Sequence, residues 1–199
     1  MRLRAVLMVA LLVMAACGTL PQVRYYTLAS AAPTVAPAAA PDAGVGYRVA
    51  IGPVTVPEAL DRPQIVLRMA PNRYAIADTE RWAEPLKREI PRVLAADAGQ
   101  RLPAARVAAQ TQYGGQGADY RVPIDILRFE SVPAESITLE AAWSVRNAAG
   151  ERLHEARFVQ IEKVEAPGVA PLVSAHAKAL AALAEEIAVA VQTLVQAKR

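Results

Sequence analysis

The only cysteine of the 199-residue chain, Cys17, stands where an apolar segment ends. Two arginines in the first four residues precede ten apolar residues at 5–14, and two alanines come directly before the cysteine. This order of basic, apolar and small residues is typical of a secretory signal peptide. The apolar run is shorter than the roughly 20 residues that span a membrane. We therefore expect export and removal of residues 1–16.

The four residues Met14-Ala15-Ala16-Cys17 resemble the lipobox of bacterial lipoproteins, with Met14 where Leu is commoner. The resemblance implies a diacylglyceryl group on the Cys17 thiol and a further acyl group on the new amino terminus. Two or more chains hold a protein on a membrane, whereas one chain binds only marginally. The alternative is an ordinary exported protein with one free cysteine. In either case no disulfide can form within one chain, so the fold depends on its core.

Residues with the spacing of a catalytic or metal site are missing from the sequence. His154 opens the stretch HEARF, which lacks the second histidine of a zinc helix, and His176 has no metal spacing either. We expect both histidines at the surface or its boundary. No serine stands in a GxSxG elbow, and the glycine-rich residues 114–117 lack the Lys-Ser/Thr of a phosphate loop. The sequence thus predicts a protein that is not an enzyme and binds no metal or cofactor.

The charge balance gives no sign of a nucleic-acid partner. The full chain has 22 basic and 19 acidic residues, and loss of the two signal arginines leaves 20 against 19, a net charge of +1. Basic residues are scattered along the sequence and form no Lys/Arg run. Residues 17–199 have the length of one ordinary domain.

Period-two alternation predicts most of the secondary structure. The clearest case runs from Ile137 to Val145, where apolar residues alternate with polar or small ones. The turn signal Asn147-Ala-Ala-Gly150 then predicts an antiparallel hairpin with 152–164. A second, short hairpin is predicted around Ala70-Pro71-Asn72. The full set of predicted strands is 23–28, 47–56, 65–69, 73–77, 104–109, 120–129, 137–145 and 152–164.

Two segments have helical spacing. The first runs from Thr79 to about Ala98 and ends at Gly99, but Pro85 and Pro91 require a kink or a start delayed to about Glu84. The second begins at Ser174 as N-cap and continues almost to the end of the chain. Its apolar stripe is expected to pack on the sheet, with a contact between subunits as the alternative.

These elements predict the α+β class: a mixed, largely antiparallel sheet with two main helices packed on one face, in a single domain over 25–199. Residues 17–24 would form a lipidated start and a short tether. The Ala/Pro-rich residues 29–46 have few groups to bury and are expected to form an extended or disordered excursion from this domain.

Three stretches together resemble a known family. They are YYTL at 25–28, IGPVTVPEALDRPQIVLR at 51–68 and RWAEPL at 81–86. Their order is similar to that of the auxiliary lipoproteins of ABC-type lipid transport systems, the PqiC-like intermembrane transport lipoproteins. The resemblance implies a periplasmic lipoprotein that works with a substrate-binding protein containing mammalian-cell-entry (MCE) domains and moves lipids between the two membranes. Gly18 stands where Asp would signal inner-membrane retention, which favours the outer membrane.

The second stretch contains the candidate partner-binding residues. Two prolines enclose its Leu-Asp-Arg sequence, which predicts a rigid, exposed connector between strands. The connector is either a turn that sets the register of two strands or a contact loop for a partner or a neighbouring subunit. The candidate contact residues are Leu60, Asp61, Arg62, Pro63, Gln64, Arg81 and Trp82.

The distance from the lipid to the fold limits the role of the domain. Seven residues separate Cys17 from Tyr25, a reach of at most about 25 Å. We therefore expect a docking platform at the membrane; with the resemblance, this implies an outer-membrane subunit, as a monomer or a homo-oligomer, that binds an MCE-domain protein. A lipid carrier with an apolar cavity between the sheet and the last helix is the alternative. A lipoprotein hydrolase has the least support.

Overall fold

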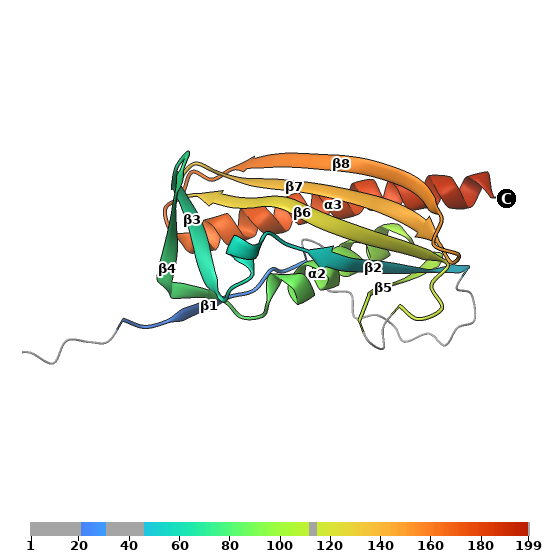
Figure 1. Ribbon diagram of the computed structural model, residues 1–199, viewed down its shortest axis with the longest axis horizontal. Helices are drawn as coiled ribbons and strands as arrows, with labels where there is room; N and C mark the ends of the chain where they lie inside the picture. The colour runs from blue at the N-terminus through green and yellow to red at the C-terminus, as the bar shows by residue number, and fades with distance from the viewer. Residues whose placement is uncertain (1–20, 31–45, 112–114, 199) are drawn as a thin grey trace, which may run out of the picture.

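The computed structural model describes residues 21–30, 46–111 and 115–198 (Figure 1). The expected signal peptide, Cys17 and most of the Ala/Pro-rich segment lie outside these ranges. The elements follow the order β1 (Arg24–Tyr26), β2 (Tyr47–Thr55), η1 (Glu58–Leu60), β3 (Gln64–Ala70), β4 (Arg73–Trp82), α2 (Leu86–Arg101), β5 (Ala105–Ala109), β6 (Tyr120–Val132), β7 (Ser136–Asn147), β8 (Arg152–Lys163) and α3 (Val169–Ala197). The predicted α+β class is confirmed.

The strands divide into two sheets instead of one. The larger sheet has the order β5-β2-β6-β7-β8, with parallel pairs at β5/β2 and β2/β6 and antiparallel pairs from β6 to β8. The smaller sheet has the order β1-β4-β3, in which β1 runs parallel to β4 and β3 antiparallel to it. Both predicted hairpins, β3/β4 and β7/β8, are present.

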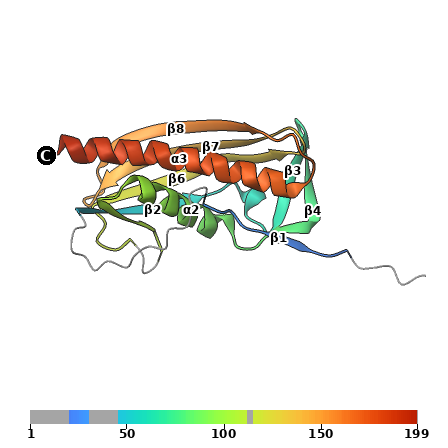
Figure 2. The same cartoon turned by 180° about the vertical axis from the view of Figure 1, so that it is seen from behind.

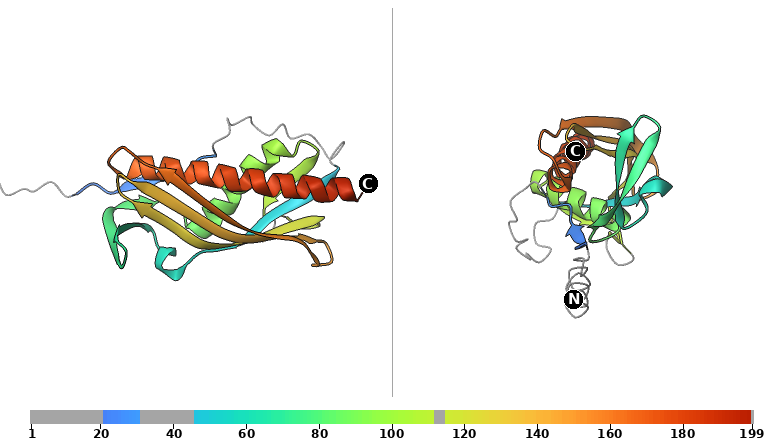
Figure 3. Two further views of the ribbon diagram at one scale, coloured as in Figure 1. Left: turned by 90° about the horizontal axis from the view of Figure 1, so that it is seen from above. Right: turned by 90° about the vertical axis from the view of Figure 1, so that its left-hand side faces the viewer.

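Both helices cover the same face of the larger sheet (Figures 1 and 2). α3 runs along the length of the sheet with α2 beside it, while the smaller sheet lies at one end (Figure 3). Fully buried side chains of α3, among them Leu183 and Ile187, belong to the same core cluster as the inward residues Leu139 and Val145 of β7. Burial of each such side chain contributes about 1.5 to 3 kcal/mol.

The first long helix begins later than its sequence period suggested. Residues 79–82 belong to β4, because Glu80, Arg81 and Trp82 pair with β1, a strand more than fifty residues away in the sequence. α2 starts at Leu86, directly after Pro85, and continues past the predicted stop at Gly99 to Arg101. Pro85 is the N-cap, where its missing backbone donor costs no helical bond, whereas Pro91 lies buried inside the helix. The predicted alternative of a start delayed to about Glu84 is therefore close to the observed one, because residues 79–82 pair with β1.

The last helix begins earlier than predicted. Its first residue is Val169 and its N-cap is Gly168, so Ser174 is not the cap but an exposed residue within the helix. Gly168 has a φ of 99°, which a glycine adopts without strain. The earlier start places His176 in the second turn, on the stripe that faces the core.

Within the described part of the chain, α3 is also the one helix long and apolar enough to span a membrane by length and composition, with a mean hydropathy of 1.4. Its stripe at Leu180, Leu183 and Ile187 is buried against the sheet and α2, as in an amphipathic core helix.

Candidate functional site

The N-terminal segment of the described chain is fixed to α2 by two buried carboxylates. Oε1 of Glu89 accepts the backbone N–H of Leu28 at 2.8 Å and the hydroxyl of Thr27. Two helical turns further on, Oδ1 of Asp97 accepts the hydroxyl of Ser30. Glu89 and Asp97 have no exposed surface. The segment that leads away toward Cys17 is therefore held by hydrogen bonds as well as by strand pairing.

Burial raises the pKa of Glu89, because the charged form loses its hydration, although the bonds from Thr27 and Leu28 and the charge of Arg92 act in the opposite direction. The sequence analysis missed this residue. Glu89 stands between Leu86 and Ile90 on the apolar stripe of α2. An acidic residue on an apolar stripe could have indicated a buried, hydrogen-bonded carboxylate.

The connector between β2 and β3 folds as a short 3-10 turn close to β1. Leu60 is half-buried against the core, whereas Asp61, Arg62 and Pro63 are exposed. Asp61 forms an ion pair with Nζ of Lys87 on α2 at 2.6 Å, and both side chains are more than 40% exposed. Such a pair contributes little to stability. The exposure of Asp61, Arg62 and Pro63 is compatible with a contact loop. The Pro63 carbonyl accepts the N–H of Trp82 at 2.7 Å, which is compatible with a turn that sets the register of two strands.

The remaining candidate contact residues lie in the smaller sheet. Gln64 is paired with Arg81, which is itself paired with Tyr25 of β1. Trp82 is only 7% exposed, and its ring packs 6.2 Å from that of Phe129. The fold thus brings all seven candidates together at the β1 end of the molecule. Trp82 belongs to the core there and is not available for a partner. Among the candidates, Asp61, Arg62 and Pro63 are exposed enough for the predicted contact.

A small hollow of about 110 Å³ lies beside the connector. Its wall is mostly apolar and includes Leu60 from the connector and Leu127, which is 39% exposed, from β6. Leu127 projects because the register between β6 and β7 shifts there, so that the inward positions change from Ile126 to Phe129. A hollow of this size has room for about one apolar side chain.

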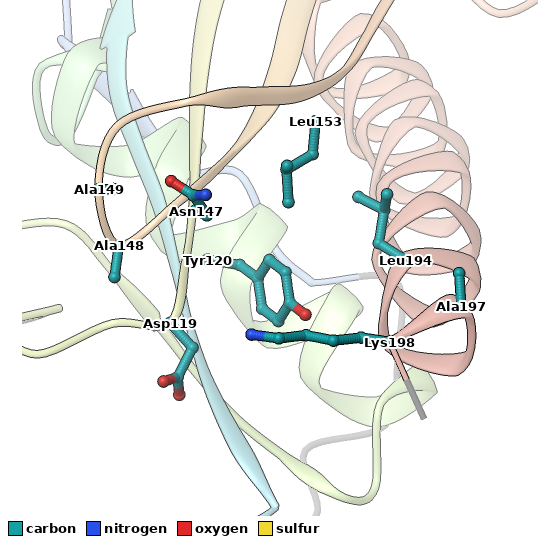
Figure 4. A pocket seen from close by; sticks show the side chains of 9 residues that line it. All are labelled: Asp119, Tyr120, Asn147, Ala148, Ala149, Leu153, Leu194, Ala197 and Lys198. Carbon is teal, nitrogen blue, oxygen red and sulfur yellow. The ribbon is translucent and has the colours of Figure 1, made fainter.

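A larger open pocket of about 520 Å³ lies at the opposite end, between the final turns of α3 and the β7/β8 turn (Figure 4). Leu153 and Leu194 face one another across it, and the ring of Tyr120 lies between them and the polar residues. The Lys198 side chain extends across the pocket toward Asp119. Apolar walls with a few polar groups are typical of small-ligand sites. Sequence reasoning missed this pocket because its residues come from distant segments.

His176 and Ser131 form a buried pair that the sequence analysis did not anticipate. Nε2 of His176 lies 2.9 Å from Oγ of Ser131, and the imidazole stacks on Phe129 with 3.8 Å between ring centroids. His176 is 1% exposed, so its predicted surface position is wrong, whereas the prediction for His154 is confirmed. Burial lowers the pKa of His176 to about 3, and the ring is therefore neutral. Its Nδ1 has no partner among the described residues, and no acidic third group orients it.

A cluster of charges joins the two sheets. Glu130 of β6 accepts hydrogen bonds from Arg68 at 2.6 Å, Arg128 at 2.7 Å and the Tyr74 hydroxyl at 2.8 Å. Burial raises the pKa of Glu130, but these three donors together outweigh it and hold the pKa below its usual value. Arg68 and Tyr74 come from the β3/β4 hairpin, so Glu130 connects that hairpin to the larger sheet through an ion pair and a hydrogen bond. In the described ranges, no group of three metal-ligating side chains comes together.

Solved structures with the same fold were found by comparison. An uncharacterised protein shares the fold with a TM-score of 0.69 and 20% identity, over 85% of this chain and 99% of that one. A Xanthomonas campestris protein of the DUF330 family aligns with a TM-score of 0.63 and 19% identity, over 88% and 97% of the two chains. At these identities the likeness shows the fold alone. No match was found among curated proteins.

The sequence itself gives the family. Residues 26–188 match the family described as ABC-type transport auxiliary lipoprotein component. The matched range runs from β1 to the last third of α3 and contains both the connector and the two carboxylates that hold the N-terminal segment. The chain therefore belongs to the family of ABC-type transport auxiliary lipoprotein components.

Proposed function

We propose that this auxiliary lipoprotein is anchored through acylated Cys17 in the outer membrane and docks an MCE-domain protein of an ABC-type lipid transport system there. The family match over 26–188 carries this proposal, because it covers most of the described fold, from the end of β1 into α3. The lipobox resemblance at 14–17 supplies the anchor. Gly18 after the cysteine favours the outer membrane over the inner one.

The attachment of the N-terminal segment supports a platform and argues against a shuttle. Tyr26 accepts the N–H of Ala83 at 2.7 Å, and Leu28 is bonded to Glu89, so the fold begins within a few residues of the tether. A tether of at most about 25 Å then keeps this end of the domain near the bilayer. The exposed connector residues Asp61, Arg62 and Pro63 lie at the same end, where they would meet a partner or a neighbouring subunit.

The deciding experiment combines mass spectrometry of the mature amino terminus with capture of an MCE-domain protein by the full-length protein in detergent. We expect an acylated Cys17 and a captured MCE component. Insertion of a flexible ten-residue segment after Cys17 should reduce transport, because the platform would lose its position. An unacylated terminus, or full transport with the longer tether, contradicts the proposal.

The role of the connector has its own test. Exchange of both Asp61 and Arg62 for alanine should leave folding intact, since the Asp61–Lys87 pair is exposed. Loss of complex formation in this folded variant supports a contact loop. Loss of folding supports a register turn. Lys163→Ala, an exposed change on β8, is the control.

A lipid carrier remains the second candidate, and the pocket of about 520 Å³ is the observation that favours it. The space between α3 and the sheet is filled by side chains such as Leu180 and Leu183, so a ligand would bind at the open end and not inside the core. Mass spectrometry of lipids that co-purify with wild type and with Leu194→Arg tests this role. We expect bound lipid only if the pocket is a carrier site.

A further inference from the structure

An unusual row of arginines crosses the outer face of the larger sheet. Arg121 of β6 pairs with Arg146 of β7, and Arg146 pairs in turn with Arg152 of β8. We call these three residues the arginine row. The neighbours Val122 and Val145 are fully buried under the helices, so alternation directs Arg121 and Arg146 to the opposite face. Neighbouring strands lie about 4.8 Å apart, which spreads the row over about 10 Å.

A second pair of arginines lies near the same end of the sheet, separated from Arg121 by its β2 partner Ala50, which is buried. On the two strands beyond β6, Arg48 of β2 is in register with Arg106 of β5. All five strands of the sheet therefore carry one arginine near the same end, which is the end that holds the β7/β8 turn and the C-terminal end of α3 (Figures 1 and 3). The β1 end lies opposite.

Like charges that face one another across strands destabilise a sheet, so the arginine row lowers the stability of the isolated protein. The nearby carboxylates do not neutralise the centre of the row. Glu155 pairs with Arg152, Glu151 binds Asn147, and Asp125 accepts the hydroxyl of Thr55. Nε of Arg146 is buried and has no hydrogen-bond partner among the described residues. Within the row, Arg152 pairs with Glu155 and Arg121 donates to the carbonyl of Ala148 at 3.2 Å, so Arg146 is the member whose Nε has no partner among the described residues.

The geometry points to an acidic segment of a partner protein, most simply a helix, that lies across β6, β7 and β8 and places its carboxylates on the arginine row. On one face of a helix, residues three or four apart are separated by about 4.5 to 6 Å along the axis, which matches the spacing of the strands. Arginine also binds carboxylates through paired N–H donors. The identity of the partner, the MCE-domain component, rests on the proposed function.

The position of the row favours a protein over the anchoring membrane. Strand β7 has 12 residues and spans about 40 Å, and the tether leaves the fold at the other end of the molecule. A tether of at most about 25 Å would hold the β1 end near the bilayer, so the arginine row would lie at the end farther from it when the domain stands on the β1 end. A component that arrives from the periplasm would meet this end first.

The test uses the full-length protein in detergent and a synthetic helical peptide with glutamates four residues apart. We expect Arg146→Ala/Arg152→Ala to weaken peptide binding by about ten-fold, with weaker binding of the wild type at high salt. The matched control, Arg73→Ala/Arg88→Ala, removes the same charge at exposed positions outside the row and should bind as wild type does. Circular dichroism checks that each variant is folded.

Three results would overturn the assignment. The first is equal peptide binding by the double variant and the wild type. The second is no peptide binding by the wild type together with row-dependent binding to phosphatidylglycerol vesicles, which would make the row a membrane-binding surface. The third is a double variant that captures the MCE component as well as the wild type does. If even the wild type captures no MCE component while the peptide results hold, the proposed function fails and the acidic-segment site stands.

Discussion

The carboxylate of Glu89 accepts the backbone N–H of Leu28 at 2.8 Å, in a position where neither group reaches solvent. This bond joins the segment nearest the predicted lipid attachment site to the helix layer of the domain. A pull on the tether is therefore transmitted to α2 and not only to the short strand β1. Under the proposed function, this contact would keep the domain close to its membrane.

Glu89→Ala should lower the free energy of unfolding by about 1 to 3 kcal/mol, because the buried N–H of Leu28 loses its acceptor. Urea titration measures the loss, and limited proteolysis should show earlier cleavage within residues 21–30. Glu89→Gln keeps an acceptor at the same place and serves as the control. Since burial raises the pKa of Glu89, the folded state binds this proton more readily than the unfolded state, and Glu89 does not contribute to acid unfolding.

His176 should make the protein less stable as the pH falls below about 6.5. Its pKa in the folded state is about 3, so between these values the unfolded state binds the proton and the folded state does not. The contribution is fully present above pH 6.5 and falls by about 2 kcal/mol by pH 5. Urea titrations at pH 7 and pH 5 measure it. In His176→Gln, the difference between the two pH values should shrink by that amount; an unchanged difference would refute the assignment.

Glu130→Gln should loosen the smaller sheet without unfolding the larger one. The change leaves Arg68 and Arg128 without their partly buried carboxylate, at an expected cost of about 1 to 3 kcal/mol. Hydrogen exchange should accelerate in β3 and β4 and remain slow in β7. Glu135→Gln, in the exposed β6/β7 turn, is the control. Equal protection of β3 and β4 in both variants would show that apolar contacts alone hold the two sheets together.

Arg146→Thr should raise the thermal stability of the isolated protein. It removes the central charge of the arginine row and places a residue with high strand propensity in β7, a gain of about 0.2 to 1 kcal/mol. Thermal unfolding at low salt measures the gain, and added salt should reduce it. Arg73→Thr removes an exposed arginine that has no arginine opposite it and should have a smaller effect. A lower melting temperature for Arg146→Thr would mean that the row stabilises the sheet.

The sequence by itself determined the local elements and the family. Alternation from Ile137 to Val145 predicted β7 correctly, because side chains of a strand alternate between two faces whatever lies beyond them. The motifs at 25–28, 51–68 and 81–86 indicated the transport auxiliary lipoproteins, and the match over 26–188 confirmed it. The anchor at Cys17 stays a prediction.

Only the tertiary structure decided which distant residues meet. Pairing with β1 made 79–82 a strand although their period suggested a helix, and packing buried His176, because both effects depend on partners far away in the sequence. The scattered arginines 121, 146 and 152 gave no run in the sequence. They became a row because antiparallel pairing sets residues side by side by register and not by their distance along the chain.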